Sequence, residues 1–105
     1  MKTPERRKAE RVKLSLKASW EGILEQQEGE VTDLSTTGCF ILTAHQVQRG
    51  ELIRIEIGES LAIWGEVVYE IEEMGFALRF NAVGEDRERL AQLIEDAKKA
   101  RKKSR

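Results

Sequence analysis

The feature that most restricts the fold of this sequence is a change in its hydrophobic period after residue 80. From residue 12 onward, apolar and polar residues alternate, and one apolar face collects Val12, Leu14, Leu16, Ala18 and Trp20. A period of two is typical of a half-buried β-strand. The same pattern, interrupted by turns, predicts strands at residues 12–21, 28–34, 39–43, 53–57, 61–72 and 76–80.

Beyond the last strand the period becomes that of a helix. Apolar residues recur with spacings of three, four and seven, at Leu90, Leu93, Ile94 and Ala97. Acidic residues precede this stripe and basic residues follow it, which matches the helix dipole at both ends. Strands at this spacing, then one helix, indicate an all-β dominated fold: a six-stranded antiparallel β-barrel with a C-terminal α-helix packed on it.

Length and composition narrow the class of protein. The chain has 105 residues, 40% hydrophobic and 35% charged, which indicates one globular domain with a charged surface. No apolar run approaches the roughly 18 residues that span a bilayer, and no apolar stretch follows the basic start as in a secretory signal. The single cysteine, Cys39, cannot form an internal disulfide, so we expect a cytoplasmic protein.

Charge is unevenly distributed along the chain. The net charge is −1, but residues 1–17 carry +5, residues 98–105 carry +6, and the residues between them carry −12. An acidic body repels the phosphate backbone, so nucleic acid is not the expected partner. The basic ends can still hold a small anion, and the tail at 98–105 leaves contact with nucleic acid, anionic lipid or an acidic protein as alternatives.

The inventory of reactive side chains does not indicate an enzyme. The one histidine, His45, lies in a polar segment, and Cys39 lies among apolar residues, where a buried thiol is expected. No Cys/His cluster has metal-ligand spacing. We therefore expect neither catalysis nor a metal or other cofactor.

Three aromatic residues are expected to be structural. Trp20 ends the apolar face of the first strand, and Tyr69 falls in phase with the core positions of the fifth. Trp64 falls on the opposite face of that strand, and we expect it to pack beneath the helix.

Two short polar segments carry the chemistry of a binding site. One precedes the first strand and the other forms the turn after the second; together they contribute Arg6, Arg7, Arg11, Asp33, Ser35 and Gly38. They offer cations for phosphate, a carboxylate for base N–H donors, a hydroxyl, and a glycine that lets backbone approach closely. These are the parts of a site for an anionic purine nucleotide.

With these residues in place, the chain resembles the PilZ-domain family of bacterial cyclic di-GMP receptors. The family motif R-x-x-x-R before the first strand matches Arg7 to Arg11, and the motif [D/N]-x-S-x-x-G matches Asp33 to Gly38. The resemblance covers about residues 5–97. It implies a six-stranded barrel that binds cyclic di-GMP (c-di-GMP) between the N-terminal segment and the barrel face.

The resemblance also implies roles for single residues. Arg7 and Arg11 would bind the phosphates and the guanine edge, Asp33 would accept from guanine N–H groups, and Ser35 would bond polar ligand atoms. Gly38 would let the main chain approach the ligand. An arginine at the position of Arg6 accompanies a stacked ligand dimer in this family.

The expected organisation is a basic ligand-binding arm at 1–11, the barrel with its helix at 12–97, and a basic tail at 98–105. We expect the arm to change conformation on binding and a protein effector to be reached in trans. The alternative is a protein-interaction module of the same fold whose output needs no nucleotide. The sequence leaves open the downstream process, one ligand or an intercalated dimer, and a monomer or a dimer of the protein.

Overall fold

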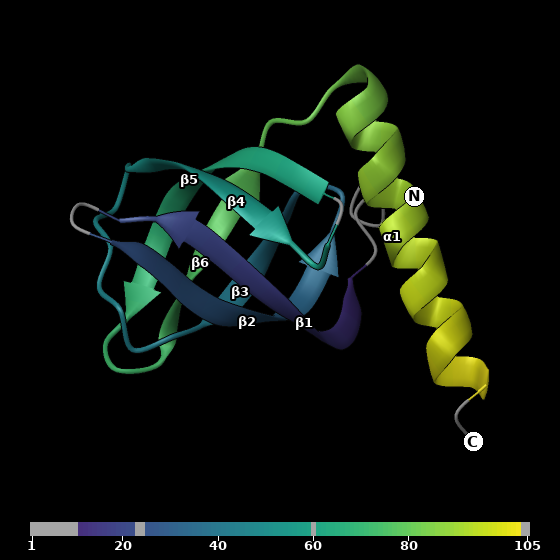
Figure 1. Ribbon diagram of the computed structural model, residues 1–105, viewed down its shortest axis with the longest axis horizontal. Helices are drawn as coiled ribbons and strands as arrows, with labels where there is room; N and C mark the ends of the chain where they lie inside the picture. Colours follow the sequence, from purple (N-terminus) through teal and green to yellow (C-terminus); the bar gives the residue numbers. More distant parts are fainter. Residues whose placement is uncertain (1–10, 23–24, 60, 104–105) are drawn as a thin grey trace, which may run out of the picture.

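The computed structural model describes residues 11–22, 25–59 and 61–103 of the chain. Six strands and one helix follow each other along it (Figure 1): β1 (Val12–Glu21), β2 (Gln26–Ser35), β3 (Gly38–Leu42), β4 (Leu52–Ile57), β5 (Leu61–Ile71), β6 (Gly75–Phe80) and α1 (Gly84–Lys103). The strands close into a barrel in the order β1-β2-β3-β6-β5-β4, and every neighbouring pair is antiparallel. The predicted fold class is confirmed.

The barrel interior is the hydrophobic core. Trp20 is buried there, its ring edge-on to Phe76 at 5.3 Å between centroids, and its indole N–H donates to Gln27 at 3.1 Å. The structural role predicted for Trp20 is confirmed. In β1, β4 and the first part of β5, inward and outward residues alternate, which is why the period of two predicted these strands.

Helix α1 lies across one end of the barrel (Figure 1). Leu90 and Ile94 are buried in the core, and Leu93 and Ala97 pack against it, as the spacing predicted. Trp64 does not pack beneath this helix: its side chain is 58% exposed on the outside of β5, so that expectation was wrong. No helix in the described part of the chain is long and apolar enough to cross a membrane.

The strand pairing shifts register at three places. One is in β1 between Lys13 and Leu16, and the other two are β-bulges that change which residues face outward. The register of β2 shifts between Val31 and Asp33, and that of β5 shifts between Val67 and Tyr69. Each extra residue reverses the alternation beyond it, so Asp33 and Tyr69 lie on the outer surface. Tyr69 is 52% exposed, and the prediction that it packs in the core was wrong.

The strand seams differ in length. β1 and β4 pair through three residues only, Ala18 to Trp20 with Ile55 to Ile57, whereas the other seams hold five to eight pairs. The closure of the barrel therefore depends on its shortest ladder.

Candidate functional site

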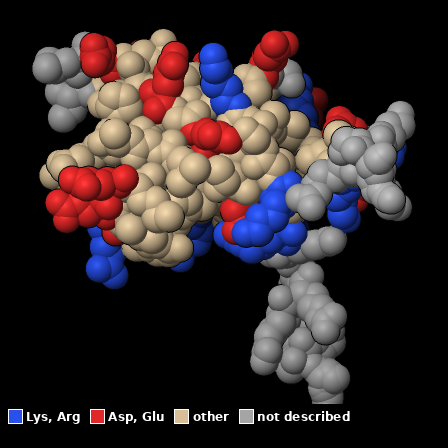
Figure 2. Space-filling model, turned by 90° about the horizontal axis from the view of Figure 1, so that it is seen from below, with Lys and Arg blue, Asp and Glu red and all other residues tan. Residues whose placement is uncertain are grey.

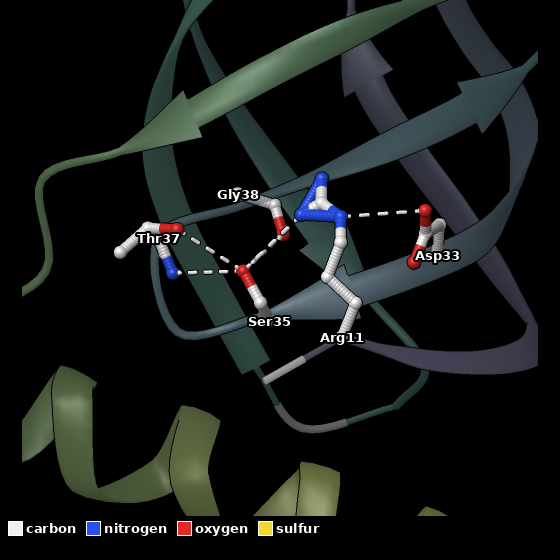
Figure 3. A network of polar contacts seen from close by, with 5 residues as sticks. All are labelled: Arg11, Asp33, Ser35, Thr37 and Gly38. Carbon is white, nitrogen blue, oxygen red and sulfur yellow. Dashed lines mark hydrogen bonds and ion pairs between the residues drawn. The ribbon is translucent and has the colours of Figure 1, made fainter. Parts of the chain in front are cut away.

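The residues of the two polar segments that the structure describes come together at one end of β1 and β2 (Figure 3). Arg11 directly precedes β1, and the cross-strand pairing of Lys13 with Asp33 brings the start of β1 beside the end of β2. Arg11 Nε lies 3.4 Å from Asp33 Oδ2, and one terminal nitrogen of the same guanidinium lies 3.4 Å from Ser35 Oγ. A cation, a carboxylate and a hydroxyl thus form one network.

Ser35 is fully buried and shapes the turn. Its Oγ accepts from the backbone N–H of Thr37 at 3.1 Å and lies 3.1 Å from Thr37 Oγ1 and 3.4 Å from the Gly38 carbonyl. These bonds are those of a serine turn, in which a hydroxyl replaces a backbone partner. Thr37 was not singled out in the sequence, where its only signal is its place two residues after this serine.

Asp33 holds an unusual oxygen. Its side chain is 24% exposed overall, yet Oδ1 is buried. Within residues 11–22, 25–59 and 61–103, it is the one buried side-chain oxygen or nitrogen with no hydrogen-bond partner. An unsatisfied buried acceptor costs about 1–3 kcal/mol, and more when charged. Oδ1 is therefore an acceptor for which the barrel supplies no donor.

Gly38 is required by the barrel itself. A Cβ at this position would meet the backbone carbonyl of Leu78 on β6 closer than real Cβ contacts allow. Its φ is not positive, unlike those of Gly50, Gly58 and Gly84 among the described residues. The glycine therefore lets β3 approach β6 and fixes the turn on the barrel wall.

A row of side chains leads from Asp33 across the outer surface. The cross-strand partners are Asp33 with Phe40, Phe40 with Ala77, and Ala77 with Tyr69, on four successive strands. The rings of Phe40 and Tyr69 lie 6.3 Å apart between centroids and cover Ala77, which is buried. A partly buried Phe40 and an exposed Tyr69 thus continue the polar network.

Cys39 lies under this site as an inert core residue. Burial raises the pKa of its thiol to about 12, an effect that the nearby Arg11 charge reduces and Asp33 adds to. The thiol is protonated at neutral pH and inaccessible, as predicted.

Two predicted site residues, Arg6 and Arg7, lie outside the described residues. In the part of the chain that is described, no three His, Cys, Asp or Glu side chains gather as a metal site requires. The site that the structure places is therefore built from Arg11, Asp33, Ser35 and Gly38.

On the face in Figure 2, acidic side chains lie at the left, along the upper edge and near the centre, with a broad tan area of uncharged side chains between them. The closed barrel, the helix across its end and the polar turn at that end define the class, a small β-barrel domain with a surface site. Residues 5–96 match the PilZ domain family, and the chain belongs to this family. The resemblance seen in the two motifs is confirmed.

Solved structures share the fold at low sequence identity. The PilZ domain of YcgR from Escherichia coli with c-di-GMP superposes with a TM-score of 0.73 at 18% identity, covering 94% of this chain and 97% of that one. The Bacillus subtilis inhibitor of motility MotI/DgrA gives 0.70 at 18% identity, covering 87% and 50%. The complex of YcgR with c-di-GMP gives 0.71 at 19%, covering 94% and 49%. This chain thus spans about half the length of MotI/DgrA and of YcgR. A search of curated proteins found no match.

Proposed function

We propose that this protein is a c-di-GMP receptor whose binding site is the network of Arg11, Asp33 and the Ser35–Gly38 turn, completed by Arg6 and Arg7. Membership of the PilZ family supports the proposal, and so does the YcgR domain of the same fold that was solved with c-di-GMP. The observation that carries it is the buried Asp33 Oδ1 without a donor, beside a half-exposed guanidinium.

The chemistry of guanine fits these groups. The guanine edge offers N–H donors, and the Asp33 carboxylate, 24% exposed, would turn outward to accept them through Oδ1, the oxygen that has no donor in the protein. The Arg11 guanidinium has five N–H donors, of which the contacts to Asp33 and Ser35 use two. The others are available to phosphate or to the O6/N7 edge of guanine, both of which accept planar, multi-donor pairing.

The remaining residues of the site take supporting roles. We assign Ser35 the positioning of Arg11 and of the turn, because its Oγ already contacts Arg11, Thr37 and the Gly38 carbonyl. The exposed Tyr69 ring, in line with Asp33, is a surface on which a base can stack. Arg6 and Arg7 would close over the ligand, and Arg6 would cover a second, intercalated ligand molecule.

The arm at 1–11 would act as the switch that reports binding to a protein effector in trans. Ordering about five residues costs roughly 5–10 kcal/mol of backbone entropy. Three charge-assisted contacts return about 5–9 kcal/mol. Because the two terms nearly cancel, the arm adds little affinity while its conformation changes. Backbone NMR relaxation of residues 2–11 with and without c-di-GMP tests this, and equal rigidity in both states would exclude a switch.

Calorimetric titration with c-di-GMP, in competition with GTP and cyclic GMP, tests the receptor function. We expect saturable binding of c-di-GMP that neither competitor displaces at equal concentration. Arg11→Lys keeps the positive charge but loses the planar guanidinium group with its several N–H donors, and it should weaken binding at least tenfold. Trp64→Ala is the matched control on a distant surface. Protection of the Cys39 thiol from Ellman's reagent checks that each variant is folded. Absence of binding by the folded parent protein would refute the proposal.

A further inference from the structure

A second exposed aromatic residue lies on the wall formed by β4 and β5. Trp64 is 58% exposed and Leu52, on the neighbouring strand, is 66% exposed. Trp64 pairs with Arg54 and Leu52 with Glu66, so Trp64 and Leu52 are diagonal neighbours on the same outer surface. In the barrel order, β4 and β5 lie across the ring from β2 and β3, which carry Asp33 and its turn. The c-di-GMP site proposed above makes no use of this surface.

Two hollows of about 470 Å³ each flank these side chains, and both are lined by Leu52 and Trp64. One opens beyond the Trp20–Ile55 pair, where β1 and β4 separate, and reaches Glu21, Glu51 and Glu56. The other reaches Glu66, Arg79 and Phe80. Trp64 therefore forms a ridge with a depression on each side, unlike the even surface of a regular pair of strands.

The charges around the ridge favour one sign of partner. The two hollows contain four glutamates and two arginines. Each arginine already contacts a glutamate of the same surface, Arg54 with Glu56 at 3.7 Å and Arg79 with Glu66 at 3.0 Å. The surplus is negative and comes from Glu21 and Glu51. A second copy meeting this surface through its own would oppose acid to acid, so a two-fold dimer is disfavoured here.

We propose that the Trp64 surface (Leu52 and Trp64 with the glutamates of the two hollows) is a docking site for a protein segment that combines apolar side chains with arginine or lysine. Apolar anchors of the partner fill the hollows, and its cations lie over the indole face and against Glu21 and Glu51. Exposed tryptophan at the centre of a polar rim is typical of such interfaces. The site does not rest on nucleotide binding, and it gives a chemical character to the partner that the proposed function requires.

Heteronuclear NMR of the full chain without nucleotide tests the proposal with defined peptides. The probe is a five-residue peptide of alternating arginine and leucine; the controls replace arginine by glutamate or leucine by serine. We expect the first peptide to shift the Trp64 indole N–H and the amides of Leu52 and Glu66, and each control to bind at least tenfold more weakly. The buried Trp20 indole, bonded to Gln27, is an internal reference that should not shift.

Variants separate this surface from the rest of the molecule. Trp64→Ala should abolish the peptide-induced shifts at Leu52 and Glu66, and Glu51→Gln should weaken binding severalfold. Tyr69→Ala, which removes an equally exposed aromatic ring elsewhere on the barrel, should leave peptide binding unchanged. Equal response to the basic and acidic peptides, or no response, would overturn the proposal. So would a Trp64 indole shift that depends on protein concentration in the absence of peptide, because it would identify a second copy as the occupant.

Discussion

The barrel has two surfaces with aromatic side chains, and they differ in how tightly their side chains are held by the rest of the fold. The Asp33 surface (Arg11, Asp33, Phe40 and Tyr69) is joined to a buried serine turn and contains a carboxylate oxygen without a donor. On the Trp64 surface the large apolar side chains stand in solvent between ion pairs that are themselves exposed.

The difference fits the two kinds of ligand proposed for these surfaces. Buried polar atoms held in fixed geometry are suited to one small molecule with matching donors, because folding has already removed water from these atoms. Exposed apolar side chains beside hollows are suited to a larger partner that removes water from a wide area. A buried polar atom without a hydrogen-bond partner and a solvent-exposed apolar ring are thus separate indications of a binding site. This domain has both, at Asp33 Oδ1 and at Trp64.

Asp33→Ala should cause the largest loss of c-di-GMP affinity. A small loss would contradict the distinction between the two surfaces. In the proposed complex the substitution would remove the carboxylate that accepts from two guanine N–H groups, each bond worth about 1.5–3 kcal/mol, so c-di-GMP affinity should fall more than about 100-fold. Asp33→Asn keeps one acceptor oxygen and should lose less. Calorimetry measures both. Because the substitution also removes an unsatisfied buried oxygen, the free energy of unfolding should change by less than about 1 kcal/mol. Retained affinity in Asp33→Ala would place the ligand elsewhere.

Gly38→Ala tests how rigidly the Asp33 surface is built. The new Cβ would collide with the Leu78 carbonyl, a backbone group that cannot rotate away. The free energy of unfolding should fall by about 1–3 kcal/mol or more, as for other overpacked sites. Urea denaturation measures it. The matched substitution Gly65→Ala, beside Trp64, places a Cβ 3.3 Å from a flexible Leu78 methyl group and should cost less. Equal losses would mean that the two walls are equally tight.

Comparing Tyr69→Ala with Trp64→Ala tests whether the two surfaces act independently in c-di-GMP binding. Tyr69→Ala should reduce c-di-GMP affinity by the value of one stacked base, about 1–3 kcal/mol, or roughly 5- to 150-fold. Trp64→Ala should leave that affinity unchanged. Parallel titrations of the two variants give the result, and a loss in Trp64→Ala equal to that in Tyr69→Ala would show that the surfaces are not independent.

The smallest effect is expected at the exposed ion pair of the Trp64 surface. Glu66 and Arg79 are 3.0 Å apart with side chains 41% and 61% exposed. Pairs of this kind contribute about 0–1 kcal/mol, so Glu66→Gln should change the free energy of unfolding by less than that. Thermal unfolding at low and high salt measures it. A larger loss would mean that this surface is more rigid than its exposure indicates.

The fold was predictable from the sequence because alternation and helical spacing are local patterns. Leu90 and Ile94 lie where their spacing placed them, and Trp20 lies in the core. The network of Arg11, Asp33 and Ser35 could be expected only as a set of residue types, since their approach depends on the pairing of β1 with β2. Asp33 Oδ1 without a donor is a property of packing and leaves no trace in the sequence.

The two aromatic residues were placed wrongly for different physical reasons. Tyr69 follows a bulge, and an extra residue in one strand reverses the inward and outward phase of all that follow. A period-two pattern read through the bulge therefore puts Tyr69 inside. The phase of Trp64 was read correctly as opposite to the core stripe. Helix α1 lies across one end of the barrel (Figure 1), and the Trp64 side chain remains 58% exposed on the outside of β5.

The short β1–β4 seam has a consequence for motion. A ladder of three residue pairs is the easiest place for a closed ring of strands to unzip, so transient opening should start there and hydrogen exchange at Ser19 and Ile55 should report it. β1 begins next to Arg11 and ends at Glu21, in the hollow beside Trp64. One strand therefore runs between both surfaces, held by eight residue pairs to β2 but by only three to β4.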